Sequence, residues 1–571
     1  MTIPLVKLTV LSRVDEPLHV VINRMASSKV SMYGIALVVD ENMVLHGVIN
    51  NGDVLRLVAA GIDLLTPVGD VMVRDPVTAP INSSDHFILN RVRTLISNRT
   101  GGKKDLTRYV PLVDSNRVVL DVVDVFSLLA RSSRQPDYIE VYGLGFVGLT
   151  VSVALASRGH FVTGIDINPK LVDQLVSGVP HVHERRLPEM LRRTLKDQQL
   201  TISTQPSTNH HRVVLIAVGT PVDDEGNVSL KALQSTCEVI SSRLKRGDLV
   251  MLRSTVPVGT TRGLVRALLE NGSNMKAGED FHLSFTPERT VEGQAMDELI
   301  SLPQIVGGLT PRCCERAVHF WQTLTDTVVT VESLEAAEMV KLINNSFRDL
   351  SFSFSNGFAL LADQYNLDAA RVISAANEGY PRSKIPSPSP GVGGYCLTKD
   401  PFLYASVAEE VGHGVLSGYG RRLNEKAGNY PIRVVQRFAD RIGKHVSELS
   451  VLVVGLAFKG LPETNDVRGS NGVHVCSQLV HYGCCVYGHD SVIDSASFEI
   501  SGVSFIGFNP ALDRCDALLI MNNHPNNVPD GFFDKLSGRP VLLFDGWSLL
   551  NRHEVEQYDN ITYSCMGYMT P

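Results

Sequence analysis

Cys396 stands in the part of the chain that is best suited to covalent chemistry. The segment PRSKIPSPSPGVGGYCLTKDP carries four prolines and three glycines before this cysteine, so we expect residues 381–401 to form a defined loop, neither helix nor strand. A glycine-rich approach lets a substrate reach a thiol closely, as a nucleophile requires. Cysteine more often fills space in a core, and these residues alone leave both interpretations open.

Lys341 and Asn345 are spaced four residues apart in SLEAAEMVKLINNSFRDLSFSFSNGFALLADQYN, which predicts a long helix. Residues i and i+4 lie on one helical face, so both side chains can converge on one oxygen atom. The alternative is a lysine on a solvated helix face.

Gly143, Gly145 and Gly148 form a GxGxxG pattern between an expected strand and an expected helix. These glycines permit a tight turn, a close approach to a pyrophosphate and close packing of helix on strand, while the helix N-terminus faces the phosphate charge. Asp166 ends the next expected strand, where a carboxylate accepts from ribose hydroxyls and repels the 2′-phosphate of NADP. The pattern predicts that NAD binds here. A structural glycine turn with a solvated aspartate is the alternative.

Strands and helices alternate from residue 137 to about 330, which is typical of a parallel sheet with helices on both faces. Strands then cease until a new α/β unit opens near residue 449. We therefore predict an α/β protein with a Rossmann-like domain at 137–330, a central helical domain at 331–430 and a second Rossmann-like domain at 431–571.

Residues 1–135 contain a weak internal repeat, joined to the rest by the polar linker 132–137. Both copies read strand, turn, strand and helix, and the pair resembles a tandem CBS module, an α+β family that often binds adenine nucleotides. Asp53 stands where that family holds a ligand ribose, and Asp124 is placed in register with it in the second copy. A packing module without ligand is equally compatible with the sequence.

The composition excludes several classes of protein. The 571 residues have a formal net charge of −7, so no global basic field exists to hold nucleic acid. No apolar run reaches the roughly 18 residues of a membrane span, and acidic residues near the N-terminus argue against a signal peptide. The nine cysteines show no CxxC spacing, which indicates reduced thiols in a cytoplasmic protein and no metal site.

GVGGYCLTKDP resembles the GxGGxCxxKD signature of the UDP-glucose/GDP-mannose dehydrogenase family. The resemblance runs from Tyr138 to the C-terminus and includes, in the family's order, GLGFVG, RSTVPVGT, TPERTVEG, EMVKLINN and GLAFKGLPETNDVRGS. It implies a four-electron, NAD-dependent oxidation of the C6 alcohol of a UDP-sugar to a carboxylate, through a thiohemiacetal and a thioester on the cysteine.

The resemblance also implies residue roles. Cys396 matches the nucleophile, Lys341 and Asn345 the pair that stabilises the developing oxyanion, and Asp400 an acid that holds water or transfers a proton. Glu288 matches an acid–base glutamate and Thr255 a residue that places water. Thr220 is expected beside the nicotinamide, Phe146 and Val147 in the glycine turn, and Lys459 and Arg468 on the UDP diphosphate.

Two features favour a UDP-N-acetylhexosamine, either UDP-N-acetylglucosamine or UDP-N-acetylmannosamine, over UDP-glucose. Arg289 and Thr290 follow Glu288 where UDP-glucose enzymes commonly carry apolar residues. Arg382 lies in a YPR segment similar to that of bacterial enzymes for N-acetylhexosamines, in which such an arginine can reach the substrate of a neighbouring subunit. Tyr395 departs from that subgroup, where histidine is usual, and Lys399 stands where valine or lysine occurs.

The sequence is compatible with three functions. The first is an active UDP-sugar 6-dehydrogenase in a dimer or larger homo-oligomer, with UDP-glucose as the alternative substrate. The second is a two-electron dehydrogenase of the β-hydroxyacid type, which needs neither Cys396 nor a third domain. The third is an adenylate-sensing binding protein with an inactive dehydrogenase half, which predicts degraded catalytic motifs, whereas those quoted above are intact.

Overall fold

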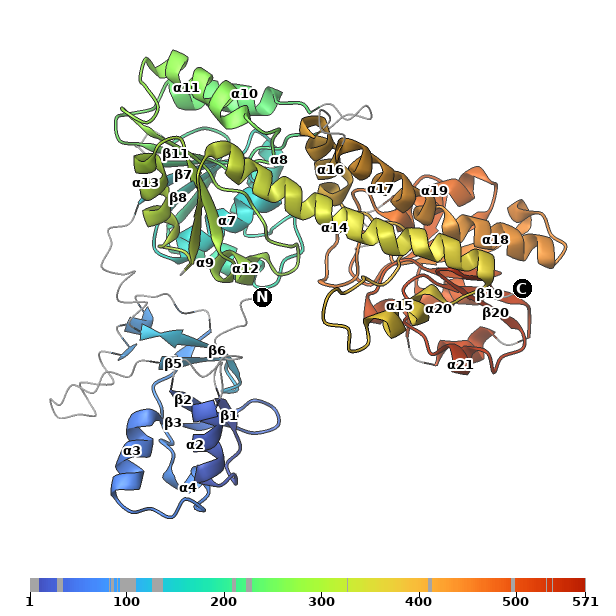
Figure 1. The fold of residues 1–571 in the computed structure, drawn as a ribbon, viewed down its shortest axis with the longest axis horizontal. Helices are drawn as coiled ribbons and strands as arrows, with labels where there is room; N and C mark the ends of the chain where they lie inside the picture. The colour runs from blue at the N-terminus through green and yellow to red at the C-terminus, as the bar shows by residue number, and fades with distance from the viewer. Residues whose placement is uncertain are drawn as a thin grey trace.

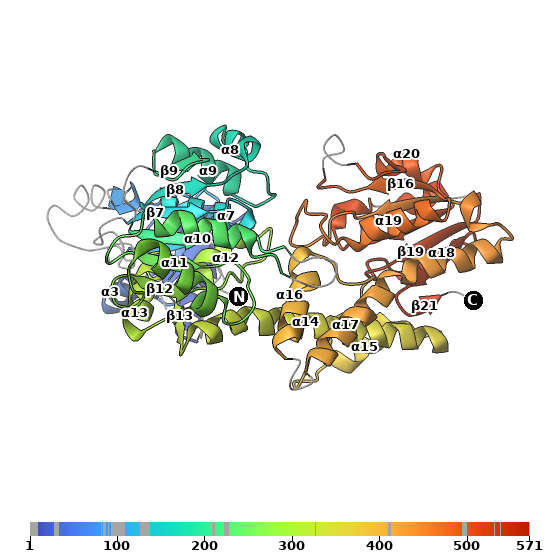
Figure 2. The same cartoon turned by 90° about the horizontal axis from the view of Figure 1, so that it is seen from above.

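The chain folds into two sheet-containing lobes joined by a long helix, with a smaller N-terminal module below the first lobe in Figure 1. Figure 2 shows the same two lobes from above. We call residues 138–331 the N-lobe, 450–569 the C-lobe and 10–125 the N-terminal module. This computed structural model describes residues 10–27, 34–81, 83, 87–89, 91–92, 109–125, 137–207, 212–221, 228–325, 327–408, 413–493, 499–529, 531–536 and 538–569.

The N-lobe sheet has the strand order β14-β13-β12-β11-β10-β7-β8-β9. All neighbours are parallel except β12 and β13. The order reverses between β7 and β10, and the carboxyl ends of strands at such a switch point are where doubly wound sheets bind ligands. The strands are β7 (Tyr138–Tyr142), β8 (Phe161–Ile165), β9 (Leu200–Ser203), β10 (Val213–Ile216), β11 (Leu249–Leu252), β12 (His282–Phe285), β13 (Gln304–Gly308) and β14 (Val328–Val331).

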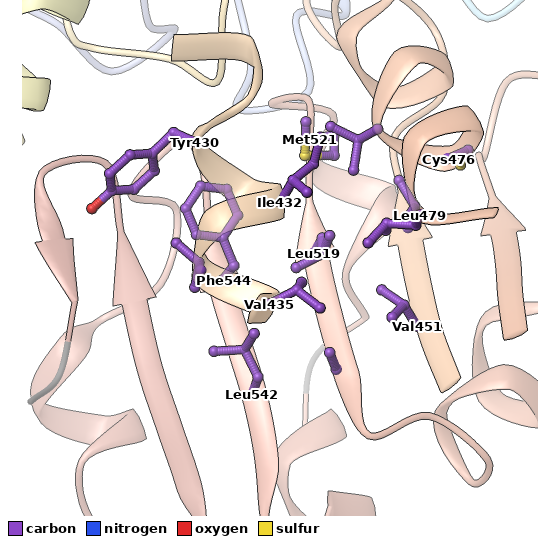
Figure 3. Close-up of a cluster of buried hydrophobic side chains, with 14 of the residues drawn as sticks. Tyr430, Ile432, Val435, Val451, Cys476, Leu479, Leu519, Met521, Leu542 and Phe544 are labelled. Atoms are coloured by element: carbon purple, nitrogen blue, oxygen red, sulfur yellow. The ribbon is translucent and has the colours of Figure 1, made fainter. Parts of the chain in front are cut away.

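The C-lobe sheet repeats this topology in the order β17-β16-β15-β18-β19-β20-β21. Only the last pair is antiparallel. Figure 3 shows Tyr430, Ile432 and Val435 packed with Leu519, Leu542 and Phe544 in its core. The strands are β15 (Ser450–Val454), β16 (Cys485–His489), β17 (Val503–Phe505), β18 (Ala517–Ile520), β19 (Val541–Asp545), β20 (Ile561–Cys565) and β21 (Tyr568–Met569).

Between β14 and β15 the described chain contains helices and no strand, with a long loop at 378–394. Helix α14 (Leu334–Ala362) begins after Ser333, whose side chain accepts from the Ala336 N–H, and its 29 residues run from the N-lobe to the C-lobe (Figure 1). It is followed by α15 (Ala369–Asn377), α16 (Tyr395–Val407), α17 (His413–Gly428) and α18 (Tyr430–Arg441). The predicted α/β fold with two largely parallel sheets and a helical region between them is confirmed.

The other helices of the two lobes cover the faces of the sheets. They are α7 (Phe146–Ser157), α8 (Pro169–Val176), α9 (Leu187–Lys196), α10 (Lys231–Ser241), α11 (Arg266–Ser273), α12 (Ala295–Ser301), α13 (Pro311–Trp321), α19 (Asn471–His481), α20 (Phe508–Leu512) and α21 (Arg552–Val555). Within the described ranges, a membrane-crossing length of apolar helix is not found.

The N-terminal module contains two three-stranded sheets of related layout. In each, a strand pairs parallel with the first arm of an antiparallel hairpin, and both hairpins shift register one residue before their turn. Asp40 and Asp114 accept equivalent backbone N–H groups in the two turns. The elements are β1 (Val10–Ser12), α2 (Leu18–Ser27), β2 (Ile35–Val39), β3 (Leu45–Asn50), α3 (Asn51–Ala59), α4 (Val68–Val71), β4 (Ala79–Pro80), β5 (Tyr109–Val113) and β6 (Val119–Asp124).

The predicted register between the two copies is wrong. Ile35 pairs with Asn50 in the first hairpin, and Tyr109 pairs with Asp124 in the second. Asp124 therefore corresponds to Asn50, because the Asp40 and Asp114 turns define the alignment. The residue of the second copy that corresponds to Asp53 lies outside the described residues, as does most of the predicted linker. Identification of the module as CBS-like stays a prediction.

Candidate functional site

A cleft of about 1170 Å³ runs between the two lobes and along α14. Its walls combine the glycine turn after β7, the loops after β10, β11 and β12, the middle of α14, the start of α16 and the loop after β15. Most of the predicted site residues line it: Gly143, Gly145, Phe146, Val147, Asp166, Thr220, Thr255, Glu288, Lys341, Asn345, Cys396, Lys459 and Arg468. Residues far apart in the sequence thus meet in one place.

The glycine turn fits a bound dinucleotide. Gly143 has φ +87°, and a Cβ there would lie 2.8 Å from Val218 Cα, so only glycine suits this position. Gly148 packs against the Gly143 carbonyl, and Gly145, before the first residue of α7, faces open space. Backbone N–H groups at the start of this helix are therefore accessible to a pyrophosphate.

Asp166 follows β8 at the same end of the sheet. Its Oδ2 accepts from the Leu144 N–H at 2.8 Å and its Oδ1 from the Asn168 N–H at 3.0 Å. The carboxylate is thereby held beside the glycine turn, where ribose hydroxyls would lie in a fold of this kind. Thr220 lies beyond β10, and its hydroxyl donates to the Thr255 carbonyl at 2.6 Å.

The segment around Cys396 was predicted as a loop, and this is wrong from Tyr395 onward. Gly394 takes φ +90°, and α16 starts at the next residue, so Cys396 lies in its first turn. Pro401 lies inside this helix and cannot donate to the Leu397 carbonyl. That carbonyl instead accepts from Arg421 at 3.4 Å, so a side chain replaces the missing backbone donor.

The glycine-rich segment that leads to Cys396, residues 391–394, packs against the C-lobe. A Cβ on Gly393 would lie 2.6 Å from the Gly469 carbonyl, and one on Gly394 would lie 2.7 Å from the Phe458 ring. Arg421 is 5% exposed and is anchored to Asp349 at 2.6 Å, and it reaches the Val392 carbonyl at 3.5 Å. The segment that precedes the Cys396 thiol is therefore held closely by its neighbours.

Cys396 is the exposed cysteine of this cleft. The surrounding protein partly desolvates the thiol and raises the pKa of Cys396 above its ordinary value, although the positive charge of Lys341 acts to lower it. Asp400 adds to the rise. A cation beside a thiol is the arrangement that favours the reactive thiolate form.

Lys341 and Asn345 both face the cleft, but they do not converge on one oxygen of the protein. Lys341 Nζ donates to the main-chain oxygen of Glu288 at 2.7 Å. The Asn345 amide donates to Asp400 Oδ2 at 2.6 Å, and Asp400 is fully buried. The two donors flank the same space from one helical face.

Glu288 is 3% exposed and forms an ion pair with Arg253. Its Oε1 accepts from the N–H groups of Arg289 at 2.7 Å and Thr290 at 2.8 Å. Burial acts to raise the pKa of Glu288, but Arg253, the Thr290 N–H and Lys341 outweigh it and hold the pKa below its ordinary value. The carboxylate is ionised and already well bonded, an arrangement more suited to fixing its loop than to giving up a proton.

Lys459 and Arg468 reach the cleft from the C-lobe and meet Glu292 of the N-lobe. Lys459 donates to the Glu292 carbonyl at 2.7 Å, and burial lowers the pKa of Lys459. Arg468 binds Asp466 with two nitrogens, at 2.9 and 2.6 Å, and lies 3.6 Å from the Glu292 carboxylate. Two cations that converge on one side of the cleft can hold a diphosphate.

The structure does not bring Arg382 into the cleft of its own chain. The side chain is exposed and lies over the Tyr380 ring at 5.5 Å. Asp53 lies in the N-terminal module, where it completes a capping box with Asn50 and pairs with Arg56 at 2.5 Å. Its carboxylate is thus already bonded within its own helix.

The cleft also contains charged residues that were not predicted as site residues, among them Arg253, Glu292, Arg348 and Lys399. Arg253 and Glu292 belong to the quoted motifs RSTVPVGT and TPERTVEG, so attention to every charged motif residue could have found them. Arg348 follows Lys341 by seven residues, which places it on the same face of α14. Lys399 is 6% exposed and donates to the Thr220 carbonyl at 3.3 Å.

Three family descriptions match the chain. The NAD binding domain of the UDP-glucose/GDP-mannose dehydrogenase family matches residues 137–325, its central domain 335–421 and its UDP binding domain 452–552. The UDP-N-acetyl-D-mannosamine dehydrogenase of Pyrococcus horikoshii is 31% identical over 388 residues, which cover 68% of this chain and 89% of that protein.

Solved structures agree with the sequence comparisons. The UDP-D-ManNAc dehydrogenase from Pyrococcus horikoshii superposes with a TM-score of 0.68 at 28% identity, covering 75% of this chain and 99% of that one. A UDP-glucose dehydrogenase from Pyrobaculum islandicum gives 0.65 at 28% identity, covering 76% of this chain and 98% of that one. The chain belongs to the UDP-glucose/GDP-mannose dehydrogenase family, with an NAD-binding and a UDP-binding domain.

Proposed function

We propose that this chain oxidises the C6 alcohol of a UDP-N-acetylhexosamine, UDP-N-acetylmannosamine or UDP-N-acetylglucosamine, to the carboxylate. Membership of the family makes it an NAD-dependent UDP-sugar dehydrogenase. The observation that carries the proposal is the meeting, in one cleft, of the glycine turn, the Cys396 thiol with Lys341 and Asn345, and the cation pair Lys459 and Arg468.

Cys396 explains how an alcohol can lose two hydrides. The first loss from C6 leaves an aldehyde, to which the Cys396 thiolate adds through a new S–C bond to give a thiohemiacetal. Loss of the second hydride gives a thioester, and water then breaks the S–C bond to release the carboxylate and the free thiol. Gly145 and Asp166 would hold NAD at the glycine turn, where it would supply the hydride acceptor for each of the two oxidations.

Lys341 and Asn345 are placed to stabilise negative charge on the substrate oxygen. Each now donates to a protein oxygen, Glu288 O and Asp400 Oδ2, and a substrate C6 oxygen between them would accept from both. Donors of this kind contribute about 3–4 kcal/mol each to the transition state. Asp400 is the group proposed to take the proton from the attacking water, with Thr255 and Glu288 shaping the water's position.

The sugar assignment is supported by the similarity to the UDP-N-acetyl-D-mannosamine dehydrogenase of Pyrococcus horikoshii and by the polar residues Arg289 and Thr290 after Glu288. UDP-glucose is the alternative, because a UDP-glucose dehydrogenase superposes nearly as well. Arg382, which is exposed outside its own cleft, is proposed to reach the substrate of a neighbouring subunit.

The test is the amount of NADH released by purified enzyme with limiting UDP-N-acetylmannosamine, UDP-N-acetylglucosamine or UDP-glucose. Two NADH per sugar, and loss of this activity in Cys396→Ser, are expected. Cys485→Ser is the matched control, since this exposed thiol lies outside the cleft. One NADH per sugar at completion, or full activity in Cys396→Ser, would contradict the mechanism.

A homodimer or larger assembly is also proposed. The central helices expose large apolar side chains, with Phe347 70%, Phe354 65%, Val415 70% and Tyr419 55% exposed. These side chains lie on α14 and α17, which pack together, and apolar side chains exposed on neighbouring helices are a candidate protein–protein interface. Light scattering coupled to size exclusion, on the wild type and Phe354→Lys, tests it; an unchanged mass in the variant would remove this face from the interface.

The N-terminal module is proposed to bind an adenine nucleotide between its two repeats and to regulate the enzyme. The repeated hairpins and the position of Asp53 in the first turn of α3 support this. Calorimetric titration of the full chain with AMP and ATP, with Asp53→Ala for comparison, is the test, carried out with the dinucleotide site saturated by NAD. If neither nucleotide gives a heat of binding, the module does not bind adenine nucleotides and has a structural role.

A further inference from the structure

The side chain of Tyr395 lies between the two lobes and contacts charged groups in the cleft. Tyr395 is the first residue of α16, directly before Cys396, and its side chain lines the cleft. Its ring has two cations close to it: Arg468 of the C-lobe at 5.0 Å from the ring centroid and Lys399 at 4.9 Å. Both lie within the range in which a cation is attracted to an aromatic face.

The hydroxyl of the same side chain points to the other lobe. It donates to the main-chain oxygen of Thr220 at 3.5 Å, and Lys399 donates to the same oxygen at 3.3 Å. Burial raises the pKa of Tyr395, so the phenol keeps its proton and remains a donor. Thr220 lies at the carboxyl end of β10, next to the switch point of the N-lobe sheet.

The backbone of Tyr395 directly follows Gly393 and Gly394, which pack against Gly469 and Phe458 and hold this end of α16 close to the C-lobe. One side chain therefore connects three parts of the site. Its backbone is held next to the C-lobe, its ring lies against Arg468 and its hydroxyl reaches Thr220 on the N-lobe.

We propose that Tyr395 is a positioning residue that couples the cation holding the UDP diphosphate, Arg468, to the Thr220 carbonyl on the cofactor side of the cleft. This inference rests on the proposed function and deepens it. The ring orients Arg468 for the diphosphate, and the hydroxyl fixes the Thr220 loop. The two contacts belong to different atoms, so they can be separated by substitution.

Two variants make this separation. Tyr395→Phe keeps the ring and removes the hydroxyl, whereas Tyr395→Leu removes both. We expect Tyr395→Phe to bind UDP as the wild type does, but to show a lower kcat and a larger kinetic isotope effect with sugar deuterated at C6. That increase is expected because a less well-fixed Thr220 loop slows hydride transfer relative to product release.

Tyr395→Leu is expected to weaken UDP binding in addition, by roughly fivefold to tenfold, because the cation–π contact to Arg468 is lost. Calorimetry with UDP alone measures this without turnover, so it remains decisive if none of the sugars is a substrate. Tyr482→Leu, an exposed tyrosine of the C-lobe outside the cleft, is the matched control. Thermal melting of each variant separates these effects from unfolding.

The outcomes are distinct. Wild-type UDP affinity in Tyr395→Leu would overturn the contact with Arg468, and an unchanged isotope effect in Tyr395→Phe would overturn the contact with Thr220. Absence of NADH from the wild type with every UDP-sugar would count against the proposed function, while the UDP titration would still decide the role of the Tyr395 ring.

Discussion

The side-chain amide of Asn345 donates to Asp400 Oδ2 at 2.6 Å and thereby joins α14 to α16 inside the cleft. Asp400 is fully buried, and its other oxygen, Oδ1, has no hydrogen-bond partner among the residues that the structure describes. The nearest cation to Oδ1 is Lys399 Nζ, at 3.9 Å. A buried acceptor left open in this way is suited to a water molecule or a substrate hydroxyl.

This relationship predicts the effect of Asn345→Ala. Loss of the amide leaves Asp400 with both oxygens without a donor and removes one of the two donors proposed for the substrate oxygen, so we expect kcat to fall about 100-fold to 1000-fold. Steady-state NADH release measures it. Asp400→Asn should add little to the loss in Asn345→Ala, since the two side chains act as a unit; fully additive losses would contradict the coupling.

Lys341→Met should change the reactivity of the thiol with pH. The charge of Lys341 lowers the pKa of Cys396 against the effect of burial, so its removal raises this pKa further. Alkylation by iodoacetamide requires the thiolate, and its rate profile should shift to higher pH in the variant. Measuring inactivation from pH 6 to 10 checks this. A profile that does not move would show that Lys341 does not act on Cys396.

The sequence predicted the parts of this site that depend on local patterns. The positive φ of Gly143 and the packing of Gly148 against the Gly143 carbonyl are both set within the turn itself, so the glycine spacing alone indicates the turn. Cys396 and Lys341 were placed by motifs, and the structure brings them to one cleft. The start of α16 at Tyr395 was not predictable, because Pro401 argues against a helix unless a distant Arg421 supplies the missing donor.

Contacts between segments far apart in the sequence could not be predicted either. The ion pair of Arg253 with Glu288 and the contact of Lys459 with Glu292 depend on how loops of different strands meet. A helical spacing predicted that Lys341 and Asn345 share a face, but not that each would find a different protein oxygen. The register of Asp124 was wrong because the two copies were not aligned on their equivalent turns at Asp40 and Asp114.

Asp166→Asn is expected to relax the choice of cofactor. The amide oxygen can still accept from the Leu144 N–H, but the negative charge that would repel a 2′-phosphate is gone. We expect the ratio of kcat/KM for NAD to that for NADP to fall by about tenfold or more. Initial rates with both cofactors measure it. An unchanged ratio would mean that a group other than Asp166 distinguishes the ribose of NAD from the 2′-phosphate of NADP.

Arg253→Met should destabilise the N-lobe. It leaves Glu288, 3% exposed, without its ion-pair partner, and breaking a buried pair in this way costs about 3–5 kcal/mol. Urea unfolding measures the loss. The double variant Arg253→Met with Glu288→Gln should recover much of the stability, because no buried charge remains. A double variant as unstable as Arg253→Met alone would show that packing of Arg253 on Trp321, at 4.5 Å, dominates.

Glu184→Gln should change how stability depends on pH. Glu184 is 4% exposed and accepts from the Gly293 N–H at 2.7 Å, and burial raises its pKa from 4.5 to about 7. Between these values the unfolded chain has lost the proton and the folded chain keeps it, so this group makes folding less favourable as pH rises through the window. The penalty reaches about 3 kcal/mol at pH 8.

A glutamine at position 184 carries no charge in either state and can still accept the Gly293 N–H through its amide oxygen. The melting temperature of Glu184→Gln, relative to the wild type, should therefore increase from pH 5 to pH 8. Glu189→Gln, an exposed position on α9, is the matched control. Parallel curves for the wild type and Glu184→Gln would show that Glu184 is ionised in the folded protein throughout this range, and that backbone N–H groups at the start of α12 outweigh its burial.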